Sequence, residues 1–270
     1  MNSYNPLAPL ALIWRYRELA LPLTGRRISA RYRGSLLGML WAVLNPLLML
    51  GIYTFIFSVV FQSKWGIERG DKPEFALFLF SGLILYSVFS ECLNEAPSLL
   101  LNNKLYIKQL VFPTEILAWV SVLNGLFNLV INFVILVIFQ TVVMGPPTPT
   151  LLYFPLIVLP IVLITLGSIW FVASIGIYLR DLGHIVRLFT TALLFLSPIF
   201  YPVSRIPERF QAYYSLNPFG HLLEMSKGVL FYGKAPEPTL LGACLAGSWA
   251  FSWLGYMWFM RAKKGFADVV

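Results

Sequence analysis

The chain has 270 residues, of which 58% are hydrophobic and only 12% are charged. An ordinary soluble domain carries roughly 25% charged residues, so this chain has too few polar side chains to cover a water-exposed globule. The composition excludes a soluble enzyme or binding domain and predicts a membrane protein. The net charge of +8 lies largely beside apolar segments, which is typical of membrane orientation rather than of nucleic-acid binding.

The N-terminal segment, residues 9–33, mixes leucine, isoleucine and tryptophan with arginines. This composition predicts a helix that lies in the membrane interface rather than crossing it. Four of its arginines, which stop abruptly at an apolar run, are expected to anchor it to lipid headgroups: Arg26, Arg27, Arg31 and Arg33. We therefore predict a cytoplasmic segment with an amphipathic interface helix over 1–35, followed by a transmembrane domain over 36–270.

Six apolar segments approach or exceed the roughly 20 residues that a membrane-spanning helix needs. They are residues 37–62, 75–97, 114–144, 151–179, 185–202 and 239–260. The fifth is the shortest. The sequence thus predicts an all-α membrane protein with six transmembrane helices.

The basic residues predict the orientation of these spans. With the N-terminus in the cytoplasm, thirteen of the 20 lysines and arginines fall in segments on the inner side. Because inner loops are enriched in such residues, we expect both termini to be cytoplasmic.

Residues 203–238 are too polar for a seventh span, yet they contain two short apolar pieces on either side of Asn217-Pro218. A re-entrant helical hairpin, dipping into the outer leaflet and shielded by protein, would satisfy the backbone of such a segment. An extracytoplasmic loop with an amphipathic helix is the alternative.

Several motifs of nucleotide binding, catalysis and metal binding are missing from the sequence. No phosphate-binding loop of the form GxxxxGK[ST] occurs, nor does GxSxG or HExxH. His184 and His221 fall on opposite sides of the membrane in the predicted topology, so they cannot share a metal ion. Cys92 and Cys244 lie in apolar spans, and we interpret both as buried thiols.

Ionisable residues inside spans would mark an ion pathway, but the middles of these spans contain essentially none. Glu91 and Glu95 lie near the cytoplasmic end of the second span, and Glu115 begins the third. We interpret these carboxylates as partners of interfacial arginines. A proton-coupled transporter is therefore poorly supported.

Uncharged polar and aromatic side chains follow helical spacing in two spans. The third span carries Asn124, Asn128 and Asn132 on one face. That face either binds neighbouring helices or contacts a solute, because amides facing lipid are costly. The first span carries Tyr53, Phe57 and Phe61, which either stack on sugar rings or pack between helices.

A short amphipathic pattern in residues 98–113 predicts a helix parallel to the membrane on the cytoplasmic side. Leu101 and Leu105 would lie on one side of it and Lys104 on the other. The helix is either a connector or a docking site for a soluble partner.

Six motifs give the chain a family resemblance. In order along it they are "RYRGSLLGMLWAVLNPLLML", "YIKQLVFPTEIL", "IYLRDLGHI", "FLSPIFYP", "NPFGHLLE" and "KKGFADVV". Together they resemble the membrane subunit of bacterial O-antigen polysaccharide ABC exporters (the Wzm type, an ABC-2 permease). Teichoic acid exporters share the early and middle motifs and are the near neighbour.

The resemblance implies a transporter permease rather than an enzyme. Two copies of this chain would join two nucleotide-binding subunits, which bind ATP and Mg²⁺ and hydrolyse ATP. The cargo would be polyprenyl-pyrophosphate-linked O-antigen, exported across the bacterial inner membrane. A teichoic acid or other lipid-linked glycan exporter, a small-molecule exporter, a membrane-embedded glycan enzyme and a structural anchor are the alternatives.

The resemblance also implies roles for particular residues. Residues 98–113 would be the coupling helix that meets the ATPase, through Asn103, Lys104, Tyr106 and Lys108. Spans one and five of opposite subunits would form a lateral gate, and 203–238 the periplasmic gate. We expect the channel aromatics to be Tyr53, Phe57, Phe61, Phe195, Phe200 and Tyr201. We expect the gate hinges to be Asn45 and Pro46, where proline loosens the helix, together with Asn217 and Pro218.

Overall fold

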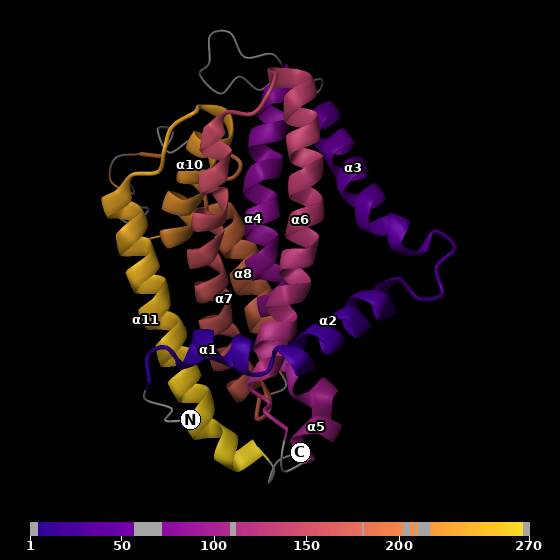
Figure 1. Cartoon of the computed structure of the whole chain (residues 1–270), viewed down its shortest axis with the longest axis vertical. Helices are drawn as coiled ribbons and strands as arrows, with labels where there is room; N and C mark the ends of the chain where they lie inside the picture. Colours follow the sequence, from indigo (N-terminus) through magenta and orange to yellow (C-terminus); the bar gives the residue numbers. More distant parts are fainter. Residues whose placement is uncertain are drawn as a thin grey trace.

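The computed structural model describes residues 5–56, 72–108, 112–179, 181–201, 206–207, 209 and 217–266. Throughout these residues the regular secondary structure is helical. The long helices run side by side along the longest axis of the molecule (Figure 1). The predicted all-α class is thus confirmed for the part of the chain that the structure describes.

Four helices of this described part are long and apolar enough to cross a membrane. They are α4 (Lys72–Leu99), α6 (Ile116–Met144), α7 (Phe154–Gly176, preceded by the 3-10 turn η4, Pro149–Tyr153) and α11 (Pro238–Ala262). They correspond to the second, third, fourth and sixth predicted spans.

Two shorter apolar helices stand where the first and fifth spans are predicted. The first comprises the turn η1 (Gly38–Leu40) and α3 (Trp41–Thr54), and the rest of that predicted span, from residue 57, lies outside the described residues. The fifth is α8 (Leu182–Leu196), which ends short of the predicted boundary at residue 202. Ser197 is extended because Pro198 follows it, and proline disfavours a helical conformation in the residue before it.

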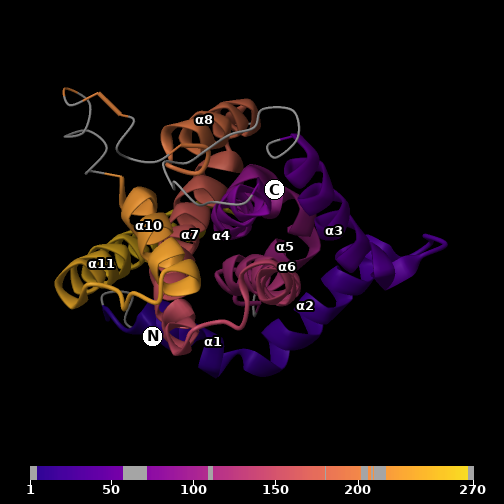
Figure 2. The ribbon, with the colours of Figure 1, turned by 90° about the horizontal axis from the view of Figure 1, so that it is seen from above.

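The predicted interface helix is two helices rather than one. α1 (Ala8–Arg15) and α2 (Arg17–Tyr32) meet at Tyr16, whose backbone leaves the helical conformation. Figure 2 shows α1 and α2 following the outside of the bundle instead of entering it. The break lets α1 lie across α11 and α6 while α2 runs past α6, so tertiary contacts override a sequence pattern that is continuous.

Two tryptophans fix α1 in this position. Trp119 of α6 donates its indole N–H to the carbonyl of Pro9 at 2.9 Å, and Trp249 of α11 donates to the carbonyl of Pro6 at 3.1 Å. Ala8 and Leu12 are fully buried beneath the helix. The N-terminal segment is therefore an integral part of the bundle surface.

The centre of the bundle is α4, which packs against α3, α6, α7, α8 and α10. α7 lies between α4 and α11, and its contact with α11 is the most extensive in the molecule. The two backbones come close at Gly167 and Gly255: a Cβ atom on Gly255 would lie 2.4 Å from the carbonyl oxygen of Gly167. Small residues allow this approach, which is how membrane helices gain van der Waals contact.

One limb of the segment predicted to be a re-entrant hairpin is described. It is α10 (Pro218–Phe231), which lies at the end of the bundle opposite α1 and packs on α4 and α7 (Figure 1). Gln140 of α6 donates to the carbonyl of Leu230 at 2.5 Å, and buried Lys227 donates to the carbonyl of Pro198 at 2.8 Å. Most of the other limb lies outside the described residues, so the hairpin stays a prediction.

Replacing Gly255 with alanine should destabilise the bundle, because the added methyl group meets the backbone of α7. Overpacking of this kind costs about 1–3 kcal/mol. The measurement is the melting temperature of the detergent-solubilised protein by size-exclusion chromatography after heating. Gly242→Ala is the matched control on the same helix, since its Cβ would meet nothing within 4 Å. Equal melting temperatures for the two variants would contradict the proposed close approach.

Candidate functional site

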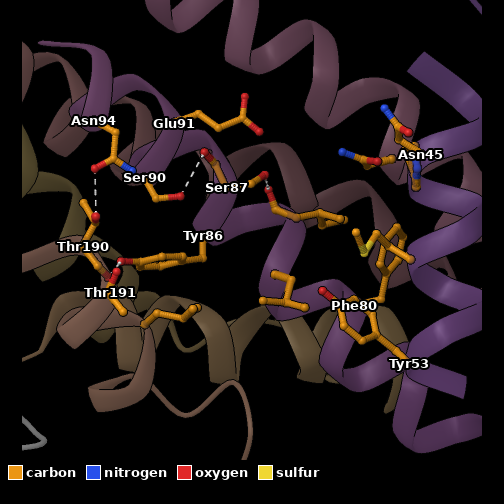
Figure 3. Close-up of a pocket in the computed structure, with 16 residues that line it drawn as sticks. Asn45, Tyr53, Phe80, Tyr86, Ser87, Ser90, Glu91, Asn94, Thr190 and Thr191 are labelled. Atoms are coloured by element: carbon orange, nitrogen blue, oxygen red, sulfur yellow. Dashed lines mark hydrogen bonds between the residues drawn. The ribbon is translucent and has the colours of Figure 1, made fainter. Parts of the chain in front are cut away.

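The most polar cavity among those described is a crevice of about 490 Å³ between α3, α4, α6 and α8 (Figure 3). We call it the polar crevice. It is lined by Asn45, Pro46, Met49 and Tyr53 of α3, by Phe80, Leu83, Ile84, Tyr86, Ser87, Ser90, Glu91 and Asn94 of α4, by Asn132 of α6, and by Thr190, Thr191 and Leu194 of α8. It therefore joins the helices of the first and fifth predicted spans along one wall of the molecule.

The wall supplied by α4 carries a polar stripe. Ser87, Ser90, Glu91 and Asn94 recur at three- and four-residue spacing, so they lie on one face of the helix. Figure 3 shows these side chains between α8 on one side and Asn45 and Tyr53 on the other. In a bundle that lies in lipid, such a face needs protein, water or a polar solute beside it.

The contact between α4 and α8 is held by hydrogen bonds. Thr190 Oγ1 donates to Asn94 Oδ1 at 2.9 Å, and the buried Tyr86 hydroxyl donates to the backbone carbonyl of Thr190. These bonds fix the position of α8 relative to α4, and hence the width of the crevice on that side.

The asparagine stripe of α6 serves more than one purpose. Asn124 is buried between helices, and Asn128 donates to Glu91 Oε2 at 3.2 Å. Asn132 lines the polar crevice. The sequence left two alternatives open for this stripe, contact with other helices or with a solute. In the structure the first asparagines of the stripe contact other helices, and Asn132 lines a cavity.

The glutamates of α4 pair with arginines of α2, which confirms the interpretation of these carboxylates. Arg27 forms an ion pair with Glu95, and Arg31 lies 4.0 Å from Glu91. Ser121 of α6 donates to Glu95 as well, at 3.3 Å. Burial lowers the pKa of the Arg27 guanidinium, but arginine remains charged at neutral pH, so the pair is ionic.

Glu115 has a different partner from the one expected. Its carboxylate lies 2.5 Å from the ammonium group of Lys263, beyond the end of α11, so a lysine takes the place of an arginine. The backbone carbonyl of Glu115 accepts from Trp170 of α7 at 3.0 Å. The start of α6, the last third of α7 and the end of α11 are thereby joined. Arg26 and Arg33, the other two predicted anchors, are exposed.

The predicted channel aromatics fall into separate places. Tyr53 lines the polar crevice. At the end of α8, Phe195 and Phe200 stack with ring centroids 5.5 Å apart, and Tyr201 donates its hydroxyl to the carbonyl of Phe195 at 2.8 Å. Phe57 and Phe61 lie outside the described residues. A channel role for these aromatics stays a prediction.

The predicted hinges have defined local structures. α3 continues through Asn45 and Pro46, and both residues line the polar crevice. Asn217 begins α10: its side chain accepts from the backbone N–H of Phe219 at 3.0 Å and donates to Ser197 Oγ at 3.3 Å. Pro218 occupies the first turn, where its missing N–H has no cost. Movement at these positions stays a prediction.

The predicted coupling segment contains a 3-10 turn, η3 (Leu101–Asn103), and the short helix α5 (Lys104–Lys108). Asn103 donates to the carbonyl of Leu99 at 2.8 Å and so satisfies the end of α4. Tyr106 stacks on Phe112, with centroids 4.4 Å apart. The side chain of Lys108 lies outside the described part of the chain.

The exposed surface of this segment agrees only in part with the predicted amphipathic pattern. Lys104 is exposed as expected, but Leu105, assigned to the opposite and apolar side, is 79% exposed beside it. An exposed leucine next to a lysine, at the end of the bundle where α5 lies (Figure 1), is a candidate contact for a soluble partner.

Sequence reasoning missed the polar stripe of α4 and the threonines of α8. The signal for the stripe was available, because Ser87, Ser90, Glu91 and Asn94 follow the same spacing as the asparagines of α6. Thr190 and Thr191 give no such signal, since single threonines in an apolar helix usually bond their own backbone. Of the two cysteines, Cys92 is buried as predicted, whereas Cys244 is only partly buried.

The described residues form a helical bundle with four candidate membrane spans and a polar crevice between helices, an architecture that fits a membrane transport protein. Residues 20–231 match the family model described as ABC-2 type transporter. The match covers well over half of the chain, so the chain belongs to the ABC-2 type transporter family. Membership implies an ABC transporter in which an ATPase partner acts with this permease.

Individual relatives are similar over nearly the whole chain. The chain is 29% identical to the O-antigen export system permease protein RfbA of Myxococcus xanthus, over 96% of its own length and 97% of the relative's. It is 27% identical to a protein of the same name from Klebsiella pneumoniae, over 94% and 95% of the two chains. The polysialic acid transport protein KpsM of Escherichia coli is more distant, at 24% identity over 80% and 82%.

Reversing the charge of Arg27 should weaken the attachment of α2 to α4, because Glu95 would then face a second carboxylate. We expect Arg27→Glu to lower the melting temperature of the purified protein, and the exchanged pair Arg27→Glu with Glu95→Arg to restore part of the loss. The melting temperature of the three proteins in one detergent measures this. Arg26→Glu, an exposed residue of the same helix, is the control. An exchanged pair that is no more stable than Arg27→Glu alone would refute the ion pair.

Proposed function

We propose that the chain is the transmembrane subunit of an ATP-driven ABC transporter that exports a lipid-linked polysaccharide of the O-antigen type across the bacterial inner membrane. The observation that carries the proposal is the similarity to O-antigen export permeases over nearly the full length of both chains. A relative named for polysialic acid transport makes another lipid-linked glycan the alternative cargo.

The polar crevice supports a neutral polymer as the cargo. Its polar side chains are mostly hydroxyls and amides, which exchange hydrogen bonds with sugar hydroxyls, and Tyr53 and Phe80 offer aromatic faces. Its one carboxylate, Glu91, is engaged by Asn128 and faces Arg31. A wall of this kind lets a long uncharged chain slide, because it forms many weak contacts and no strong ionic one.

In the proposed transporter each copy of this chain has six spans, and two copies form the transmembrane part. α3 and α8 supply the two further spans, and both helices expose large apolar side chains, including Leu48 and Ile52 on α3 and Leu188 and Phe189 on α8. The polar crevice lies between these two helices on the side of the bundle. A second copy placed against that side would close the crevice into a channel between the two chains, with the lateral gate at α3 and α8.

The proposed orientation places α1, α5 and the end of α11 in or near the cytoplasm, with both termini on that side. These elements lie toward one end of the bundle and α10 at the other (Figure 1). The arginines of α2 and the lysines after α11 then face the inner leaflet, as the positive-inside rule requires. In this orientation α10 is part of the periplasmic gate.

The proposed docking surface for the ATPase is the exposed side of α5. The proposed transporter takes its energy from a separate ATPase subunit, because this chain carries no phosphate-binding loop of the form GxxxxGK[ST]. Lys104 and Leu105 expose a positive charge and an apolar side chain next to each other. Asn103 and Tyr106 position the helix, since they bond the end of α4 and stack on Phe112.

Depleting the chain in its host tests the proposed cargo. Lipid-linked polysaccharide should accumulate on the cytoplasmic side while the cell surface loses it, because synthesis continues without export. The measurement is the glycan content of the surface and of the spheroplast interior after depletion. Complementation with the intact chain is the control. An unchanged surface with no internal polymer would exclude polysaccharide as the cargo and favour a small-molecule exporter.

Replacing Leu105 with aspartate tests the docking surface. We expect the ATPase subunit to co-purify with the variant at least about tenfold more weakly, which corresponds to about 1.4 kcal/mol, because the change puts a charge into an apolar contact. Leu152→Asp is the matched control, since Leu152 is equally exposed but lies in η4, before the start of α7 and away from α5. Wild-type co-purification of the Leu105 variant would show that α5 does not carry the contact.

A further inference from the structure

A second groove lies on the outside of the bundle, where α7 and α11 cross. Its volume is about 470 Å³, and it lies away from the polar crevice, on different helices. Gly167 and Gly255 contribute to its lining without side chains, Phe171 and Trp258 lie along it, and Arg261 lies at its end. The groove is part of neither the proposed transport path nor the proposed docking surface on α5.

The shape of the groove is built by specific contacts. α7 and α11 approach closely at Gly167 and Gly255, where the backbone of one helix takes the space of a side chain on the other, and the groove lies beside this contact. Trp258 donates its indole N–H to Ser174 Oγ at 2.8 Å, which ties the ring to α7. Phe171 packs against that ring, with centroids 5.5 Å apart. The two aromatic side chains are thus held in place before any ligand arrives.

The groove joins an apolar body to a cationic end. Leu254, Met257 and Phe251 line its body, and Leu254 and Phe251 expose about half of their surface outward. Arg261 is exposed in the last turn of α11, and within the described ranges it forms no ion pair. Lys263, two residues further on, is by contrast occupied by Glu115. Among the described residues, the guanidinium of Arg261 thus stands without an acidic partner at the end of an apolar groove.

The position of the groove in the bundle specifies its surroundings. α7 and α11 are both candidate membrane spans, and Arg261 belongs to the last turns of the span Pro238–Gly265. The apolar body hence lies at the depth of lipid chains, and Arg261 lies at the depth of headgroups. A volume of about 470 Å³ is also within the roughly 300–1,000 Å³ of pockets that bind small molecules.

We propose that this groove binds one anionic diacyl phospholipid of the bilayer. An acyl chain lies along Leu254 and Met257 against the aromatic wall, and the phosphate accepts hydrogen bonds from Arg261. The guanidinium fork matches phosphate geometry and stays charged, so it recognises a phosphate better than any other side chain here. The site is separate from the polysaccharide path, and it does not rest on the proposed function.

The contribution of such a lipid would be to join α7 and α11 at the end of the bundle where Glu115 meets Lys263. The lipid would lie in the groove along the crossing of these two helices and contact side chains of both. Anionic lipid should therefore raise the melting temperature of the protein, whereas a zwitterionic lipid with the same chains should do so less.

The test uses the full permease complex, reconstituted and then extracted with either dioleoyl phosphatidylglycerol or dioleoyl phosphatidylcholine. Lipids retained per permease are counted by native mass spectrometry, and melting temperatures are measured in parallel. We expect Arg261→Gln to lower phosphatidylglycerol retention about fivefold, as the loss of one basic contact to anionic lipid implies, and to remove the extra thermal stabilisation. Leu254→Trp, which fills the body of the groove, should reduce retention of both lipids.

Lys264→Gln is the matched control, because Lys264 is exposed at the same end of α11 but does not line the groove. An equal loss in this control would mean diffuse attraction to charge and would overturn the proposal, as would unchanged retention in Arg261→Gln. Displacement of phosphatidylglycerol by equimolar undecaprenyl phosphate would assign the groove to a carrier lipid instead. Cross-linking of two copies through Leu254→Cys would place a second copy there, which also contradicts the proposal.

Discussion

The polar side chains of α4 have to find partners inside the bundle, because hydrocarbon offers them none. This one requirement determines most of the arrangement around the helix. Glu95 holds α2 through Arg27 and α6 through Ser121, while Asn94 holds α8 through Thr190. Glu91 takes Asn128 of α6 and faces Arg31 of α2. A single buried helix thus fixes the places of three neighbours by chemistry that lipid cannot replace.

The same requirement explains why the polar crevice lies where it does. The polar stripe of α4 contains more side chains than find hydrogen-bonding partners on the neighbouring helices. Where the partners end, near Ser87 and Ser90, the polar face opens onto a cavity instead of onto a helix. Structural and transport roles are therefore successive parts of one helical face, and the asparagines of α6 show the same division from Asn124 to Asn132.

The sequence was sufficient for the features that depend on length and local composition. Four candidate spans lie at their predicted places, because each is a run of apolar residues with the length that a membrane-spanning helix needs. The pairing of Glu91 and Glu95 with arginines also followed from the cost of isolated charge. Three features could not be predicted from the sequence: the helical break at Tyr16, the different surroundings of the asparagines along α6, and the exposure of Leu105. Each depends on which neighbour lies opposite, and helical periodicity carries no information about that.

The attachment of α1 has a consequence for how the protein is made. Its two anchoring bonds come from Trp119 and Trp249, in the third and last of the predicted spans. A ribosome delivers Pro6 and Pro9 first and Trp249 only near the end of synthesis, so α1 cannot complete its docking until the last span has entered the membrane. The first helix to leave the ribosome is thus among the last to settle. Complete docking of α1 thus requires the whole bundle, and a chain truncated before α11 would keep the bond from Trp119 to Pro9 but lose the bond from Trp249 to Pro6.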